Sequence, residues 1–155
     1  MTRQPTPTQL ENTAILRATE TFIDLFVARP RRERYKLLLR RGDFAARLHH
    51  DLEGELVERF RVCITGHRSV GDGILRSLRA VTPSTDAFVV GGPNAIKPGR
   101  ALPIAVALHE CVGWSVGSLI LLDKGKTAFF EPEMAEFDRC ILTRDPTALK
   151  TLRGR

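Results

Sequence analysis

The stretch that decides the fold class is residues 116–131, which read Val-Gly-Ser-Leu-Ile-Leu-Leu-Asp-Lys-Gly-Lys-Thr-Ala-Phe-Phe-Glu. Its first half, Val116–Leu122, is almost continuously apolar, as in a strand that is covered on both faces. The Asp-Lys-Gly-Lys segment has turn chemistry, and residues 127–131 supply a second strand. We therefore expect a β-hairpin in which the side chains of Ile120 and Leu121 point to opposite, buried faces of a sheet.

Further elements are expected on both sides of this hairpin. After it, residues 137–143 have the composition of a third strand, and residues 145–155 read as a polar tail. Before it, residues 62–65 fit either a short strand or the tail of a helix. The remaining predictions are a helix at residues 74–81, a strand at 86–90, and an apolar helix at 102–111 with Pro103 in its first turn.

The N-terminal third of the chain is predicted to be helical. Residues 8–11, Thr-Gln-Leu-Glu, have the pattern of a capping box, which marks the start of a first helix. This helix is expected to run to about residue 28, a second one from Pro30 to Gly42, and a third from Asp43 through Leu56. The apolar residues that recur at helical spacing in the first helix are Ile15, Ala18, Phe22, Leu25 and Phe26.

Together these elements predict an α+β protein of a single domain, residues 1–155. An N-terminal helical layer of about three helices, within residues 8–56, precedes a small, mainly antiparallel sheet within residues 62–143. One or two further helices are packed on this sheet, and residues 145–155 form the polar tail. We expect the helices to cover one face of the sheet.

Three features of the chain resemble those of a group of small, uncharacterised bacterial proteins. They are the arginine-rich helix that contains Tyr35, the Gly-Ser-Leu-Ile strand at residues 117–120, and the Ala-Phe-Phe-Glu arm at residues 128–131. The resemblance covers most of the chain and implies the same domain layout. It implies nothing about activity, because the group has no known activity to transfer.

The composition indicates a globular protein in a reducing compartment. Of the 155 residues 43% are apolar, which is enough for a core without a disulfide or a structural metal. The cysteines Cys63, Cys111 and Cys140 are odd in number and have apolar neighbours. We therefore expect three buried free thiols.

No targeting or membrane segment is predicted. The N-terminus lacks the apolar core of a signal peptide, and the apolar run at residues 101–122 carries His109 and Glu110 at its middle. We expect a cytoplasmic protein without a membrane partner.

The positive charge of the chain is concentrated in one segment. Residues 29–47 contain eight basic residues against Glu33 and Asp43, a net charge of +6, which equals the net charge of the whole chain. The rest of the chain is neutral in sum, so this segment predicts a local anion-binding surface. The eight residues are Arg29, Arg31, Arg32, Arg34, Lys36, Arg40, Arg41 and Arg47.

These residues predict a non-enzymatic protein that binds an anionic partner through the basic helix, with nucleic acid as the first choice. An arginine directs two donors onto one phosphate, and Arg32, Lys36 and Arg40 fall within one arc of the helix, away from its apolar side. The alternative partner is an acidic protein surface, as in a protein–protein adaptor or an immunity-type module. The predicted polyanion-binding residues are Arg31, Arg32, Arg34, Lys36, Arg40 and Arg41.

A structural interpretation of the basic helix remains open beside the functional one. Its charged side can simply be solvated, or it can pair with acidic residues of the same chain, such as Glu53, Glu55 and Glu58.

A second anion-binding candidate is the loop at residues 91–100, Gly-Gly-Pro-Asn-Ala-Ile-Lys-Pro-Gly-Arg. Its glycines allow close backbone approach, and Lys97 and Arg100 bring positive charge before a helix N-terminus. The other interpretation is an ordinary strand-to-helix connection. Residues 66–73 have the outer spacing of a phosphate-binding P-loop, but Asp72 stands where a lysine is required, so we reject that motif.

The third functional hypothesis is a small enzyme centred on His67 and His109. With Glu110 and Cys111 these residues would supply a nucleophile and a base if the fold brought them together, which the sequence cannot show. No metal site and no cofactor are predicted, because the spacing of the histidines and cysteines fits no established zinc site.

Overall fold

The structure is a computed structural model of the chain, and it describes residues 7–47, 51–64, 70–91, 101–113, 116–133 and 139–154. Its α-helices are α1 (Pro7–Phe26), α2 (Arg32–Arg40), α3 (Phe44–Arg47), α4 (Leu52–Glu55), α5 (Val70–Val81), α6 (Ile104–Cys111) and α7 (Pro146–Arg153). Short 3₁₀ turns are η1 (Arg29–Arg31), η2 (Glu58–Phe60) and η3 (Asp123–Gly125). The strands are β1 (Arg61–Cys63), β2 (Asp86–Gly91), β3 (Ala101–Pro103), β4 (Val116–Leu122), β5 (Thr127–Glu133) and β6 (Cys140–Thr143).

The predicted α+β fold class is confirmed. The six strands form one sheet in the order β1-β6-β5-β4-β2-β3, and every neighbouring pair is antiparallel. The predicted hairpin is β4–β5, and it lies at the centre of this order with Ile120 opposite Phe129. The outermost strands, β1 and β3, are each three residues long.

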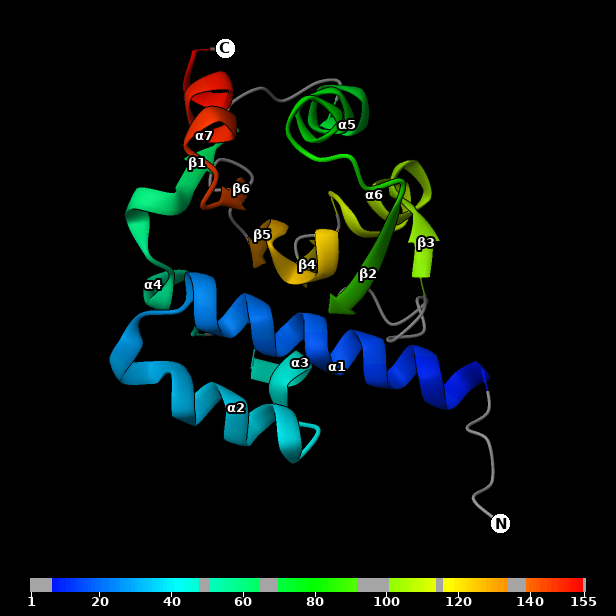
Figure 1. Cartoon of the computed structure of the whole chain (residues 1–155), viewed down its shortest axis with the longest axis vertical. Coiled ribbons are helices and arrows are strands. Elements are labelled where there is room, and N and C mark those ends of the chain that lie inside the picture. Colours follow the sequence, from blue (N-terminus) through cyan, green and yellow to red (C-terminus); the bar gives the residue numbers. More distant parts are fainter. Residues whose placement is uncertain are drawn as a thin grey trace.

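Helices cover both faces of the sheet, and the expectation that they cover one face is wrong. Figure 1 shows three layers, with α1, α2 and α3 on one side of the strands and α5, α6 and α7 on the other. The physical reason lies in the strands themselves. Because successive side chains alternate between faces and nearly all of them are apolar, each face needs its own helical layer.

The two faces of the hairpin belong to two separate hydrophobic clusters. Leu119, Leu121 and Phe130 point toward α1, where they join Phe22 and Phe26. On the other face, Ile120 and Phe129 join the apolar residues of α5, α6 and α7. The side chains of these strand residues are fully buried, and each contributes on the order of 2–3 kcal/mol relative to an exposed position.

The segment predicted as a polar tail is a helix, α7, that completes the second layer. Asp145 caps it, because its Oδ1 accepts hydrogen bonds from the backbone N–H groups of Thr147, at 2.8 Å, and Ala148, at 3.4 Å. Leu149 and Leu152 are buried, and Leu152 joins the hydrophobic cluster on this face of the sheet. The prediction failed because only one narrow stripe of this short helix is apolar, so its average composition is polar.

Several boundaries differ from the sequence prediction. The predicted third helix is divided into α3 and α4, and residues 48–50 between them lie outside the described part. Residues 61–63 form a strand, β1, which pairs with β6 and so settles the open choice at 62–65. The apolar helix α6 begins only at Ile104, because residues 101–103 pair with β2 as strand β3. The side chains of the capping box at 8–11 also lie outside the described part.

The turn between β4 and β5 fits closely against α1. Asp123, Lys124 and Gly125 all have positive φ angles, of 47°, 55° and 88°. A Cβ atom at Gly125 would stand 2.0 Å from the carbonyl oxygen of Ala18 in α1. Glycine is therefore required at this position both by the backbone conformation and by the close approach of the helix.

Candidate anion-binding surface

The basic helix α2 lies beyond α1 from the sheet, at the outside of the first helical layer (Figure 1). Its anchor is Tyr35, which is 1% exposed and stacks edge-on against Phe44 at 6.0 Å between ring centroids. Burial, with Glu55 and Asp51 nearby, raises the pKa of Tyr35 to about 12. This anchor fixes which side of α2 faces solvent; Arg34 and Arg40 are exposed, whereas Arg32 and Lys36 are half-buried.

Four of the six predicted polyanion-binding residues contact other groups of the same chain. Arg31 pairs with Glu55 at 3.4 Å, and Arg34 pairs with Asp51 at 3.2 Å. Lys36 contacts Asp24 at 2.7 Å, and this hydrogen bond raises the pKa of the lysine. The Nε of Arg32 donates to the backbone oxygen of Val27 at 2.9 Å.

The acidic partners are only partly those named from the sequence. Glu55 pairs with α2 as that interpretation expected, whereas Glu53 pairs with Arg61 at 3.1 Å and no ion pair of Glu58 is found within the described residues. In the two pairs at Arg31 and Arg34, 52% and 47% of the arginine side chains are accessible, against 22% of Glu55 and 35% of Asp51. Pairs whose arginine is open to solvent in this way contribute about 0–1 kcal/mol to stability.

Arg40 and Arg41, at the end of α2, are exposed and form no ion pair with any described residue. They lie between Leu39 and Gly42, two residues that line a groove of about 350 Å³. The rest of the groove comes from α1, α3 and the end of β2, with Leu16 47% exposed. Arg40 and Arg41 are therefore neighbours in sequence of this apolar groove, although neither of them lines it.

The loop candidate cannot be placed, because Lys97 and Arg100 lie outside the described residues. Its context nevertheless differs from the expectation. The loop joins β2 to its antiparallel partner β3, so it is a connection between two strands and not between a strand and a helix. The helix α6 begins only three residues after the loop, at Ile104.

The residues of the enzyme hypothesis do not form a nucleophile–base pair in the described part of the chain. Cys111 is fully buried, and burial, with Glu110 and Glu131 nearby, raises the pKa of its thiol to about 12. His109 and Glu110 are exposed on α6, and His67 lies outside the described residues. A thiol that is buried and protonated is a poor nucleophile.

The expectation of three buried thiols is correct for two of them. Cys111 and Cys140 are buried, whereas Cys63 is exposed. Cys63 lies on β1, an edge strand of the sheet, and the apolar residues beside it in the sequence do not cover its side chain. All three are free. Within the described ranges, no three His, Cys, Asp or Glu side chains are grouped as a metal site would require.

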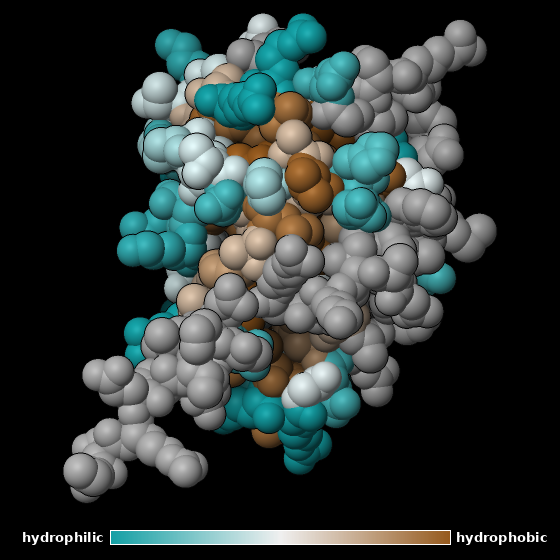
Figure 2. Space-filling model, turned by 90° about the vertical axis from the view of Figure 1, so that its right-hand side faces the viewer, coloured by the Kyte–Doolittle hydropathy of each residue, from teal (hydrophilic) through white to brown (hydrophobic). Residues whose placement is uncertain are grey.

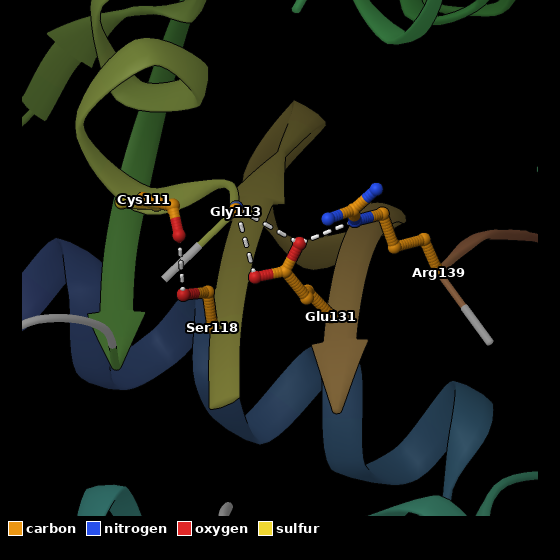
Figure 3. A network of polar contacts seen from close by, with 5 residues as sticks. All are labelled: Cys111, Gly113, Ser118, Glu131 and Arg139. Atoms are coloured by element: carbon orange, nitrogen blue, oxygen red, sulfur yellow. Dashed lines mark hydrogen bonds and ion pairs between the residues drawn. The ribbon is translucent and has the colours of Figure 1, made fainter. Parts of the chain in front are cut away.

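A buried ion pair that the sequence did not indicate joins β5 to the start of β6. Glu131 and Arg139 are 1% and 6% exposed, and the carboxylate accepts from the arginine Nε (Figure 3). Both carboxylate oxygens also accept from the backbone N–H of Gly113, at 3.0 and 3.1 Å. Ser118 donates to the backbone oxygen of Cys111 beside it, at 2.9 Å. The network fastens the end of α6 to the centre of the sheet.

A second cluster of cations was also missed. Arg59 and Arg144 both stack on the ring of Phe60, with guanidinium carbons 4.7 and 4.6 Å from its centroid. Arg153 donates to the backbone oxygen of Arg59 at 2.8 Å. We call these four residues the arginine corner. Its members come from η2, from the end of β6 and from α7, so no window of the sequence contains them together.

The opposite side of the molecule has a different character. Figure 2 shows that hydrophobic residues reach the surface across its middle, with hydrophilic residues around them. The helix α6 lies toward this side and exposes Val106, which is 42% accessible.

Comparisons of the chain with protein-family models, with curated proteins and with solved structures find no match. The resemblance to small bacterial proteins thus remains an expectation from the sequence. None of the helices in the described part combines the length and the apolar character that a membrane span requires.

Proposed function

We propose that this chain is a non-enzymatic protein that binds a polyanion, nucleic acid in first place, through the exposed side of α2. The observation that carries the proposal is the state of Arg40 and Arg41. Both are exposed at the end of a helix whose position is fixed by the buried Tyr35, and neither pairs with a described carboxylate. Guanidinium groups in this state bind phosphate oxygens without first losing a carboxylate partner from the described part of the chain.

The pairs of Arg31 and Arg34 support the same proposal. Each arginine is about half exposed, and its carboxylate contributes little stability, so both cations become available when a phosphate backbone approaches. Displacement of bound counterions from the nucleic acid then supplies most of the binding free energy at low salt. The three free cysteines fit the cytoplasm, where we place the protein in this proposal.

The test is the salt dependence of oligonucleotide binding. A labelled single-stranded oligonucleotide is titrated with the protein at several salt concentrations, and anisotropy gives the affinity. Replacement of Arg40 and Arg41 by Gln should lower the slope of log K against log salt by about 1.4, since two phosphate contacts are lost.

The matched control replaces Arg76 and Arg79 of α5, two exposed arginines on the other side of the sheet. This variant has the same net charge and should bind like the parent. If both double variants lose affinity equally, binding depends on overall charge and the assignment to α2 is wrong. Nucleic acid that co-purifies at low salt, seen as a raised 260/280 absorbance ratio, would support the proposal.

An acidic protein is the second candidate partner, and the groove beside Arg40 and Arg41 favours it. A helix with apolar residues on one side and carboxylates at its border would fill the hollow and reach both guanidinium groups. The replacement of Leu16 by Gln distinguishes the two partners. It should abolish binding of such a helix while oligonucleotide binding stays unchanged.

A further inference from the structure

The arginine corner brings three cations together, and none of them forms an ion pair with a described carboxylate. Phe60 is half-buried, packs against the hydrophobic cluster that contains Phe22 and Phe26, and lies edge-on to Phe26, with 6.5 Å between ring centroids. Its ring is therefore fixed in position. Arg59 and Arg144 stack on this ring, and Arg153 is tied to the backbone next to it.

This support leaves the hydrogen-bond donors available. A cation–π contact with an aromatic ring is made through the charge of the guanidinium group and takes up none of its five hydrogen-bond donors. Arg153 spends one donor on the backbone oxygen of Arg59 and keeps the others. All three arginines are exposed, so these donors face solvent.

The nearby carboxylates do not neutralise the corner. Glu53 is engaged by Arg61, whose side chain is only 9% exposed. Asp145, next to Arg144, accepts the N–H groups that begin α7. Glu58 is exposed and forms no ion pair among the described residues, so of these three described carboxylates only Glu58 is left to oppose the three arginines.

We infer that Arg59, Arg144 and Arg153 form a phosphate-binding site, separate from the cations of α2. A tetrahedral phosphate offers oxygens in several directions and accepts from guanidinium groups that arrive from three different elements. A planar carboxylate is best matched by a single arginine fork. The arrangement therefore suits the phosphate of a mononucleotide or of a nucleic-acid backbone better than an acidic side chain.

The position of this site gives it a second use. Figure 1 shows the turn after α1, then α4, β1 and α7 in succession along one side of the molecule. The segment before η2 is joined to this turn by hydrogen bonds between Ala28 and Glu55 and between Val57 and Phe26. A nucleic-acid strand that contacts the start of α2 would continue along this side to the corner.

The first experiment uses inorganic phosphate alone. The side-chain Nε–H signals of the ¹⁵N-labelled full chain are followed during titration with phosphate, and with chloride at equal ionic strength. Signals of Arg59, Arg144 and Arg153 should move and saturate with phosphate only. Equal movement in chloride, or equal movement of Arg17 on α1, would show a nonspecific ionic effect and overturn the inference.

Variants then separate geometry from charge. Replacement of all three arginines by Gln should weaken phosphate binding at least about tenfold, whereas the control R17Q/R76Q/R79Q should bind like the parent. Arg144→Lys keeps the charge but loses the planar fork, and we expect about a threefold to tenfold loss. Binding that is unchanged in Arg144→Lys and in Arg144→Gln would contradict the inference. Arg144→Gln also replaces the triple variant should that one fail to fold, because the described contact of this arginine is with one ring face.

The source of the phosphate is tested with two further probes. A short oligonucleotide that binds the corner more tightly than inorganic phosphate identifies the backbone as the ligand, and equal affinity identifies a free phosphate or a mononucleotide. Polyglutamate that displaces phosphate at equal charge concentration would assign the corner to an acidic protein and overturn the inference. Failure of R40Q/R41Q to affect oligonucleotide binding would contradict the proposal for α2 but not the corner.

Discussion

In α2 and at its two ends, four of the six cations expected to bind an anion contact other groups of the chain, whereas the three arginines of the corner contact an aromatic ring and a backbone oxygen. The first region is the densest run of positive charge in the sequence. The second region is invisible there, because Arg59 and Arg153 are 94 positions apart. The number of cations in a segment thus says little about how many remain available once the chain is folded. The number of available cations depends on which carboxylates the fold places beside them.

The largest expected effect tests how strongly the contribution of an ion pair to stability depends on its burial. Glu131→Gln leaves the buried Arg139 without its counter-charge, and we expect a loss of about 3–5 kcal/mol in the free energy of unfolding. The exposed pair of Arg34 is the matched case, and Asp51→Asn should cost less than about 1 kcal/mol. Urea unfolding measures both. Equal midpoints for the two variants would break the distinction between buried and exposed pairs.

A second prediction concerns the removal of the ion pairs beside α2. The double variant D51N/E55Q removes the carboxylates beside Arg34 and Arg31. Both guanidinium groups then resemble those of the corner, and oligonucleotide binding should tighten with a salt slope steeper by up to about 1.4. The control E110Q/D86N removes two exposed carboxylates elsewhere. If both variants tighten oligonucleotide binding equally, the ion pairs of Arg31 and Arg34 do not limit how well these arginines bind the oligonucleotide.

The smallest effect concerns the reactivity of the thiols, which shows whether Cys111 and Cys140 are buried in the core and whether Cys63 is exposed on β1. Burial raises the pKa of Cys111 and of Cys140 to about 12, so both remain protonated and unreactive at pH 8. Cys63, three residues after Phe60, should react at once in the native protein. Thiol titration with and without denaturant should therefore count one group and then three. Rapid native modification of Cys111 would contradict the buried position.

The same thiols give stability a defined dependence on alkaline pH. In the unfolded chain a cysteine loses its proton near its ordinary pKa of 9.0, whereas the native protein keeps it up to about 12. The unfolded state thus binds fewer protons between these values, and stability falls as the pH rises through this window. Tyr35, with its pKa raised to about 12, adds to the fall above pH 10. Melting temperatures from pH 8 to 11 check the direction.

The sequence predicts best what depends on neighbours along the chain. The β4–β5 hairpin follows from an apolar run, a turn with Gly125 and an answering strand, and α1 follows from the helical spacing of residues such as Phe22 and Phe26. Both patterns are local and repeat several times. The helix α7 was missed because two buried leucines, Leu149 and Leu152, are too few to stand out among polar residues.

The candidate sites depend on contacts that the sequence does not contain. The basic helix was located correctly, but its partners Asp24 and Asp51 are brought to it by the packing of α1 and by the segment after α3. The arginine corner depends on β1, β6 and α7 meeting at one edge. A basic residue beside an aromatic one, as in Arg59-Phe60, is the only local signal of it, and such pairs are common in any sequence.

The short outer strands have a consequence for the protein at high concentration. A sheet edge recruits strands from other molecules through the open N–H and C=O groups along it, and β1 and β3 have only three residues each. An incoming strand would find too few groups to form a lasting ladder. The long, strongly apolar strands β4 and β5, which would otherwise be the most fibre-prone part of the chain, are enclosed between neighbours on both sides. The order of strands thus protects the chain against the stacking that its most hydrophobic segment would favour.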